Sequence, residues 1–127
     1  MEMNSQKATI LVVDDEEMLR VFISKALLRN GYQVLTACDG PEALGICEQR
    51  HAEIDLLLTD LTMPRMSGDE LAATTSENWP EIRTLMISGY PNQRFLEEKR
   101  PEWRNNFLEK PFTMDELAGK VQQVLNS

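Results

Sequence analysis

Short apolar runs alternate with helical patterns along almost the whole chain. Five runs rich in Ile, Leu, Val and Met have the length of strands, and three of them are nearly continuous, which is typical of strands covered on both faces. They occupy residues 9–13, 33–37, 56–59, 83–87 and 106–108. Because helical patterns lie between the runs, their order predicts an α/β fold around a parallel sheet.

Capping residues predict the limits of the first two helices. Asp14 or Asp15 can cap a helix whose apolar side chains recur at helical spacing, and Gly31 can end it in a left-handed conformation. Asp39, followed by Gly-Pro, opens a second helix that runs to about Arg50. Both helices are long enough to cover a face of the sheet.

The later helices differ in the strength of their patterns. Ser67 caps a third helix, and Thr113 with Glu116 forms a capping box for the last one. Between them, residues 92–99 show little apolar periodicity, and Pro101 stops any helix there early. We therefore expect the fourth helix to be a short or mobile element.

The composition is that of an ordinary globular protein with one domain. The chain has 127 residues, 42% of them apolar, and we expect a polar lead at residues 1–8 and one domain at residues 9–127. A net charge of −8 argues against binding nucleic acid or an anionic membrane surface. No signal-like or membrane-spanning run is found in the sequence, so the cytoplasm is the expected compartment.

Three residues with reactive side chains receive ordinary structural interpretations. Cys38 and Cys47 form neither a disulfide framework nor a Cys-x-x-Cys site, and we interpret them as small apolar side chains. His51, the single histidine, lies at a predicted helix end and is expected to be exposed. None of the three is assigned a chemical role.

Reactive or charged residues stand at the ends of four of the five predicted strands. Asp14 and Asp15 follow the first strand, Asp60 the third, Ser88 the fourth and Lys110 the fifth. In a parallel sheet all carboxyl ends lie along one edge, where ligands bind. Each residue alone could be a helix cap, a turn residue or an exposed side chain. Together they predict one site.

The residue types at this edge predict a cation and a phosphoryl group. Three carboxylates close together repel each other, and a bound cation relieves that repulsion. An all-oxygen ligand set suits Mg²⁺ and also Mn²⁺, and Mg²⁺ usually combines one or two carboxylates with a phosphate. Lys110 and Ser88 can contact phosphate oxygens, and an aspartate can form an acyl phosphate.

The sequence around these residues resembles the receiver domain of two-component response regulators, over roughly residues 9–125. The resemblance implies a flavodoxin-like, doubly wound sheet of five parallel strands in the order 2-1-3-4-5, with five helices. It rests on residues 10–16 (ILVVDDE), 55–60 (DLLLTD), 63–64 (MP), 67–68 (SG), 86–90 (MISGY) and 107–112 (FLEKPF).

The resemblance also implies which residues form the acidic part of the site. Asp60 corresponds to the phosphoacceptor. The metal ligands of the family correspond to Asp14, which acts largely through water, to Asp15 and Asp60, and to the main-chain carbonyl of Thr62. The three aspartates match the family's motif, whereas Thr62 flanks the site at a position that varies among receivers.

Three further residues take roles that the resemblance implies. Ser88 and Lys110 correspond to the phosphate-binding pair, and Ser88 and Phe107 to the switch pair. Phe107 stands where tyrosine is common, so it has no phenol to hydrogen-bond. Tyr90 flanks the site at a position that varies among receivers. The bond between Lys110 and Pro111 is usually cis in this family.

The implied function is that of a switch in a two-component system or phosphorelay. A sensor histidine kinase or a histidine phosphotransfer protein donates the phosphoryl group, and a switched surface binds a downstream protein. Such a domain assists its own phosphorylation and dephosphorylation but is not an enzyme in the usual sense. We expect a monomer or weak dimer, as a stand-alone regulator or the terminal receiver of a hybrid kinase.

Three alternatives remain to be tested. An aspartyl-phosphate phosphatase of the haloacid dehalogenase type needs a second aspartate two residues after the nucleophile, where this chain has Thr62. A degenerate receiver that only binds proteins would not need the complete acidic set. A flavodoxin-type electron carrier needs a phosphate-cradling loop, which residues 13–16 cannot supply.

Overall fold

The computed structural model describes residues 8–89 and 92–127 and has the predicted α/β architecture. Five parallel strands form one sheet in the order β2-β1-β3-β4-β5, which confirms the predicted topology. The strands are β1 Thr9–Val13, β2 Gln33–Ala37, β3 Leu56–Asp60, β4 Arg83–Ser88 and β5 Phe107–Glu109. Of the predicted lead, only residue 8 lies within the described part of the chain.

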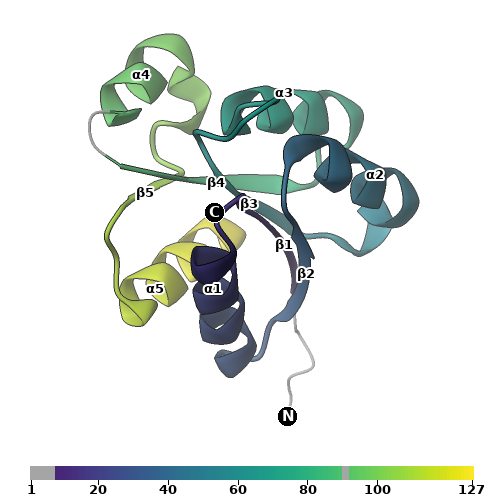
Figure 1. The fold of residues 1–127 in the computed structure, drawn as a ribbon, viewed down its shortest axis with the longest axis vertical. Coiled ribbons are helices and arrows are strands. Elements are labelled where there is room, and N and C mark those ends of the chain that lie inside the picture. Colours follow the sequence, from purple (N-terminus) through teal and green to yellow (C-terminus); the bar gives the residue numbers. More distant parts are fainter. Residues whose placement is uncertain (1–7, 90–91) are drawn as a thin grey trace.

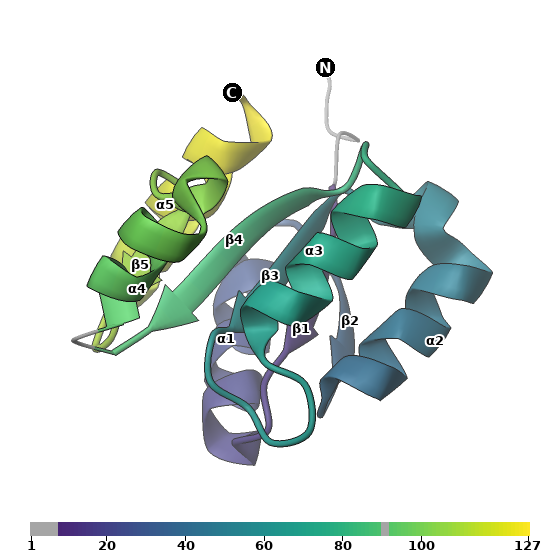
Figure 2. The ribbon, with the colours of Figure 1, turned by 90° about the horizontal axis from the view of Figure 1, so that it is seen from above.

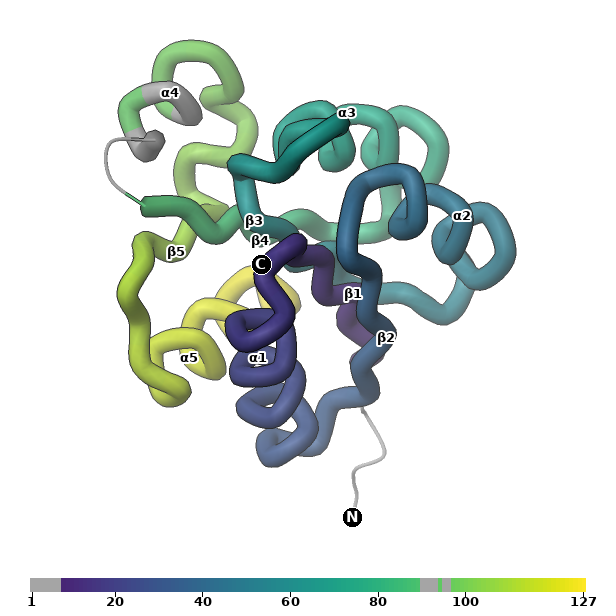
Figure 3. The backbone as a smooth tube through the Cα atoms, viewed as in Figure 1, coloured from purple at the N-terminus to yellow at the C-terminus, as the bar shows by residue number. Residues whose placement is uncertain are grey.

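Helices cover both faces of the sheet. They are α1 Glu17–Arg29, α2 Gly40–Arg50, α3 Gly68–Asn78, α4 Asn92–Lys99 and α5 Met114–Leu125, with two short 3₁₀ helices, η2 His51–Glu53 and η3 Pro101–Trp103. Helices α1 and α5 lie side by side on one face, and α2 and α3 cover the other (Figures 1 and 3). Helix α4, with eight residues, is as short as predicted and lies beyond α3 near the β4–β5 edge (Figures 1 and 2).

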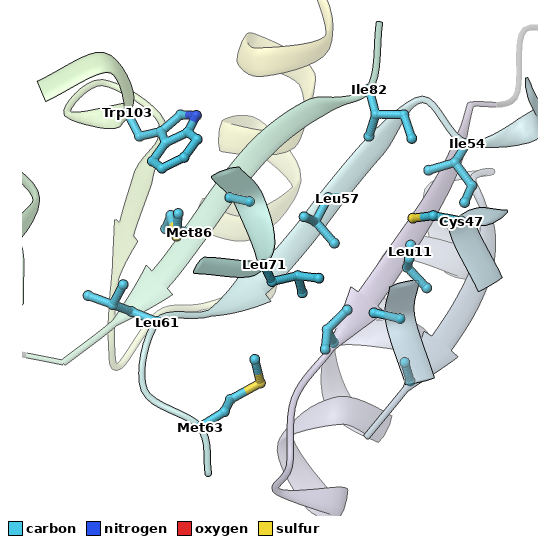
Figure 4. Packing of buried hydrophobic residues seen from close by; sticks show 14 residues of the cluster. Leu11, Cys47, Ile54, Leu57, Leu61, Met63, Leu71, Ile82, Met86 and Trp103 are labelled. Carbon is cyan, nitrogen blue, oxygen red and sulfur yellow. The ribbon is translucent and has the colours of Figure 1, made fainter. Parts of the chain in front are cut away.

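Alternation along the buried strands builds a core on each face. In β1, Leu11 and Val13 pack toward α2 and α3, whereas Ile10 and Val12 pack toward α1 and α5. The first of these cores extends from Leu11 to Trp103 near the far edge of the sheet (Figure 4). Burying a side chain of this size contributes roughly 1.5–3 kcal/mol. The sheet is therefore a rigid base for the residues at its carboxyl edge.

Most predicted helix limits agree with the structure. Gly31 ends α1 with φ +90°, and its N–H donates to the Leu28 carbonyl, as in a left-handed helix end. The side chain of Asp39 accepts from the Glu42 N–H at the start of α2. The capping boxes at the starts of α3 and α5 are both formed.

The predicted cap of α1 is wrong. The N-cap residue is Glu16, and its side chain makes no capping hydrogen bond. The carboxylate of Asp14 instead accepts from the N–H of Glu16 itself, at 2.8 Å, so it shapes the turn before the helix. Asp14 is thus directed by the turn toward the carboxyl edge of the sheet.

Two of the structural interpretations also need correction. His51 is half-buried and not exposed, because its ring stacks on Trp79 with 5.7 Å between the ring centroids. Cys38 is exposed, whereas Cys47 is buried as an apolar side chain should be. Both cysteines are free thiols.

Candidate functional site

The predicted chemistry-bearing residues converge at the carboxyl edge of the sheet. Asp14 directly follows β1, and Asp60 and Ser88 are the last residues of β3 and β4. Lys110 follows β5, and its backbone N–H donates to the Ser88 carbonyl at 2.8 Å. A carboxylate oxygen from each of Asp14, Asp15 and Asp60 lies within 4.8 Å of the other two. The edge therefore combines three acids, a hydroxyl and an ammonium.

Asp14 is the most deeply buried of the three acids, with 1% of its surface exposed. Its Oδ1 accepts from the Glu16 N–H, and its main-chain carbonyl accepts from the Arg20 guanidinium at 2.6 Å. Its Oδ2 is buried with no hydrogen-bond partner among the described residues. Burial raises the pKa of Asp14 from 3.8 to about 6, although the bond from Glu16 lowers it.

Asp60 is also nearly buried but has a cation as its neighbour. Its residue is 6% exposed, and its Oδ1 lies 3.2 Å from the Nζ of Lys110. Burial raises the pKa of Asp60, and the charge and hydrogen bond of Lys110 lower it in part. Because the Lys110 side chain is partly exposed, it can follow a group that is added to Asp60.

The three aspartates fit a hard divalent cation. Their ligand atoms are all oxygens, and a cation could bind the buried Oδ2 of Asp14, which has no hydrogen-bond partner among the described residues. A second cluster, formed by Cys38, Asp39 and Glu42, lies at the start of α2. Its carboxylates already accept from backbone N–H groups at that helix end, so it fits a structural role.

Ser88 lies at the floor of the site. Its residue is 1% exposed, and its Oγ–H donates to the carbonyl of the next residue, Gly89, at 3.1 Å. The pairing of Ser88 with Glu109 in the β4–β5 ladder brings Lys110 to the same level of the sheet. The peptide bond between Lys110 and Pro111 is cis, as the resemblance implies.

The remaining predicted residues surround this centre. Thr62 is exposed in the loop after β3, two residues past Asp60. Phe107 is half-buried at the start of β5, opposite Met86, and packs against the core beneath α2 and α3. Tyr90 lies outside the described residues. The ligand role of Thr62 and the switch role of Phe107 stay predictions.

Gly68 supports the site, although sequence analysis gave it no role. It is the first residue of α3, and its N–H donates to the Leu61 carbonyl at 2.7 Å. A Cβ atom at this position would collide with the Asp60 carbonyl oxygen and lie 2.8 Å from the Leu61 Cα. Glycine therefore allows α3 to begin directly against the backbone of Asp60.

Replacing Gly68 by alanine is expected to lower stability by about 1–3 kcal/mol, because the rigid backbone of Asp60 must shift. Urea unfolding measures this change. Gly45→Ala is the matched control, since Gly45 is exposed inside α2 with open space around it. That variant should gain about 0.5–1 kcal/mol. A Gly68→Ala variant as stable as the wild type would show that the close approach is not a constraint.

Comparisons with known proteins agree with this geometry. Residues 10–122 match the family described as response regulator receiver domain. The chain is 36% identical over 95% of its length to the sensor kinase CckA of Brucella abortus, but it spans only 13% of that protein. It is 30% identical to the response regulator receiver protein CpdR of the same organism, covering 91% of this chain and 95% of that one.

A solved structure shows the same fold. The crystal structure of a response regulator receiver domain protein from Clostridium thermocellum superposes with a TM-score of 0.86. It is 28% identical in sequence, and the match covers 94% of each chain. The likeness therefore extends over the whole sheet and its helices.

The chain belongs to the response regulator receiver domain family. Domains of this family are phosphoacceptor signalling domains of two-component systems and phosphorelays, and not enzymes in the usual sense. This membership rules out the phosphatase and the electron carrier as alternatives. The degenerate receiver is separated from the active one by the experiments below.

Proposed function

We propose that Asp60 accepts the phosphoryl group from a phosphohistidine. The observation that carries this assignment is the contact between Asp60 and Lys110 at 3.2 Å, beside two further acids. Asp14 is more deeply buried, and Asp15 is exposed. Asp60 is therefore the acid best placed to join its own carboxylate, a lysine and a cation around one phosphoryl group.

In the proposed reaction a carboxylate oxygen of Asp60 attacks phosphorus while the P–N bond of the phosphohistidine breaks. The imidazole nitrogen leaves with the electron pair of that bond and takes up a proton. Lys110 neutralises the phosphate oxygens, and the Ser88 hydroxyl turns from the Gly89 carbonyl to donate to one of them. Positioning and charge neutralisation are the main sources of rate in such transfers.

We propose Mg²⁺ as the cofactor, with Mn²⁺ as a substitute. It would be held by the carboxylates of Asp14, Asp15 and Asp60 and by the main-chain carbonyl of Thr62. When bound, the ion supplies positive charge that offsets the repulsion between the acids and the incoming phosphate. The buried Oδ2 of Asp14, which has no hydrogen-bond partner in the part of the chain that the structure describes, supports this assignment.

The phosphorylated state is proposed to differ around Ser88 and Phe107. Ser88 moves toward the phosphate, and Phe107 then moves into the space that the Ser88 side chain has left. Phe107 is half-buried at the β4–β5 edge, so a change in its position alters the surface formed by α4, β5 and α5. The phosphoryl group then acts as a ligand that shifts a population between two states.

The proposed partners are proteins. The donor is a sensor histidine kinase or a histidine phosphotransfer protein, and a downstream protein reads the switched surface. Met18, Val21 and Leu28 are large apolar side chains that α1 exposes, and α1 begins beside Asp15, where a donor protein must approach. The net charge of −8 disfavours nucleic acid as a partner.

The setting of the domain is likewise a proposal. Within the described residues no helix is long and apolar enough to cross a membrane. We propose a cytoplasmic domain over residues 9–127, monomeric or weakly dimeric. Its relatives include a sensor kinase and also a receiver protein of about the same length as this chain. The sequence is therefore compatible both with a receiver that is part of a hybrid kinase and with a stand-alone regulator.

The test is phosphorylation by acetyl phosphate with and without a divalent cation. The wild-type chain should gain one phosphoryl group in Mg²⁺, seen by intact-mass spectrometry, and Mn²⁺ should replace Mg²⁺. Chelation with EDTA should suppress the gain, because the repulsion among the three acids then stays uncompensated.

A chain that is folded in Mg²⁺ but never labelled would be the degenerate receiver. Circular dichroism in both buffers controls for folding. Labelling at the same rate in EDTA would contradict the proposed metal site.

A further inference from the structure

Two ion pairs in the described part of the chain join a nearly buried acid to a distant element. One is Lys110 with Asp60, and the other is Arg100 with Asp69, whose side chain is 10% exposed. Two of the remaining pairs join side chains that are both well exposed, and in the third a largely exposed arginine contacts an acid. A pair shielded from solvent is screened less by salt, and breaking it leaves an uncompensated charge.

The acid of this second pair is fixed to the phosphoacceptor backbone. Asp69 directly follows Gly68, which lies against the Asp60 carbonyl and donates to the Leu61 carbonyl. The Oδ1 of Asp69 accepts from the Ser67 hydroxyl at 2.7 Å. Because no free space separates Gly68 from the Asp60 backbone, a shift of that backbone must move the first turn of α3.

The base of the pair lies at the end of α4. Arg100 follows the last residue of α4 and donates from Nε to the Oδ2 of Asp69 at 3.2 Å. Its guanidinium lies 5.8 Å from the centroid of the Trp103 ring. Trp103 is 7% exposed and belongs to the same core as Leu61 and Met86 (Figure 4). Arg100 is thereby held between a core residue and α3.

We propose that the Asp69–Arg100 ion pair couples the loop that follows Asp60, residues 61–67, to α4, and that phosphorylation of Asp60 changes the strength of this ion pair. The hydrogen bond is already at the long end of the usual range, so a shift of about half an ångström in the first turn of α3 breaks it. This inference rests on the proposed function of Asp60. It adds a route to α4 that does not pass through Ser88 or Phe107.

Amide hydrogen exchange across α4 and η3 tests the coupling, with and without beryllofluoride and Mg²⁺ as a mimic of the phosphoryl group. In Arg100→Gln the amides of α4 should exchange at least tenfold faster than in the wild type. The change that beryllofluoride produces in α4 of the wild type should also become clearly smaller, because only the proposed route through Ser88 and Phe107 remains. Arg104→Gln, at an exposed arginine after η3, should behave as the wild type. Arg100→Lys, which keeps the charge, should lie between them.

A double variant shows whether the two side chains act as one pair. Asp69→Asn combined with Arg100→Gln should exchange no faster than Arg100→Gln alone, because both changes remove one interaction. Unchanged exchange in Arg100→Gln would overturn the inference, and so would a beryllofluoride response of α4 that is as large in that variant as in the wild type. The inference is also overturned if acetyl phosphate labels the wild type but beryllofluoride leaves amide exchange in α4 unchanged. Failure of labelling would instead overturn the proposed function.

Discussion

Asp60→Asn is expected to gain no detectable phosphoryl group from acetyl phosphate in Mg²⁺, whereas the wild type gains one. In the proposed reaction of the wild type, a carboxylate oxygen of Asp60 attacks phosphorus, the bond from phosphorus to the acetate oxygen breaks, and acetate leaves. The amide of asparagine is a far weaker nucleophile, so the acyl phosphate does not form. Lys110, Asp14 and Asp15 remain in the variant, but no carboxylate is left at position 60 to accept the phosphoryl group. Intact-mass spectrometry measures the difference directly.

Asp55→Asn is the matched control for this experiment. Asp55 precedes β3 at the opposite end of the strand and accepts from the Thr9 N–H at 2.9 Å, which an asparagine oxygen can also do. This variant should be labelled as the wild type is. If Asp60→Asn were labelled as well, another residue would be the acceptor, and peptide mapping after borohydride reduction would identify it.

The fold could be predicted because its determinants are local and repetitive. The runs at β1, β3 and β4 are apolar on both faces, and the structure buries both faces. Helix starts with a dedicated side chain, such as Ser67 and Thr113, were also found correctly. The error at α1 has a physical reason. The pattern shows that Asp14 stands near a helix start, but not that its carboxylate binds the turn before the helix.

Most of the site could be predicted because topology brings strand ends together. The convergence of Asp14, Asp60 and Lys110 follows from parallel strands alone. Gly68 was missed as a support, although a glycine in the first turn of a helix is unfavourable and thus calls for an explanation. The pair of Asp69 and Arg100 left no signal, because these residues are 31 positions apart and no pattern joins them.

The contact between His51 and Trp79 was missed for the same reason. The two rings come from η2 and from the residue after α3, and they meet only when those segments pack. A helix-end histidine is usually exposed, so the local sequence favoured the wrong environment. Side-chain pairing between distant surface segments is the part of this structure that local rules do not reach.

Asp14→Asn is expected to stabilise the metal-free protein at pH 7 by about 3 kcal/mol. The pKa of Asp14 rises from 3.8 to about 6 on folding, chiefly because burial disfavours its charge. The folded state therefore binds the proton of the Asp14 carboxyl group more tightly than the unfolded state does. Protonation of Asp14 thus stabilises the folded state at low pH, and this stabilisation is lost as pH rises through 6. A shift of this size corresponds to about 3 kcal/mol at pH 7 and about half of that at pH 5.

The difference in urea unfolding between the variant and the wild type, in EDTA, isolates Asp14 from the other acids. Asparagine keeps an oxygen for the Glu16 N–H and carries no charge, so the gain should grow from pH 5 to pH 7. Asp15→Asn removes the same charge from an exposed neighbour and should gain less. In Mg²⁺ the advantage of Asp14→Asn in free energy of unfolding should become smaller or change sign, because an ion that binds only the folded state stabilises the wild type. A gain for Asp14→Asn that is equal at both pH values would show that the buried charge is not its cause.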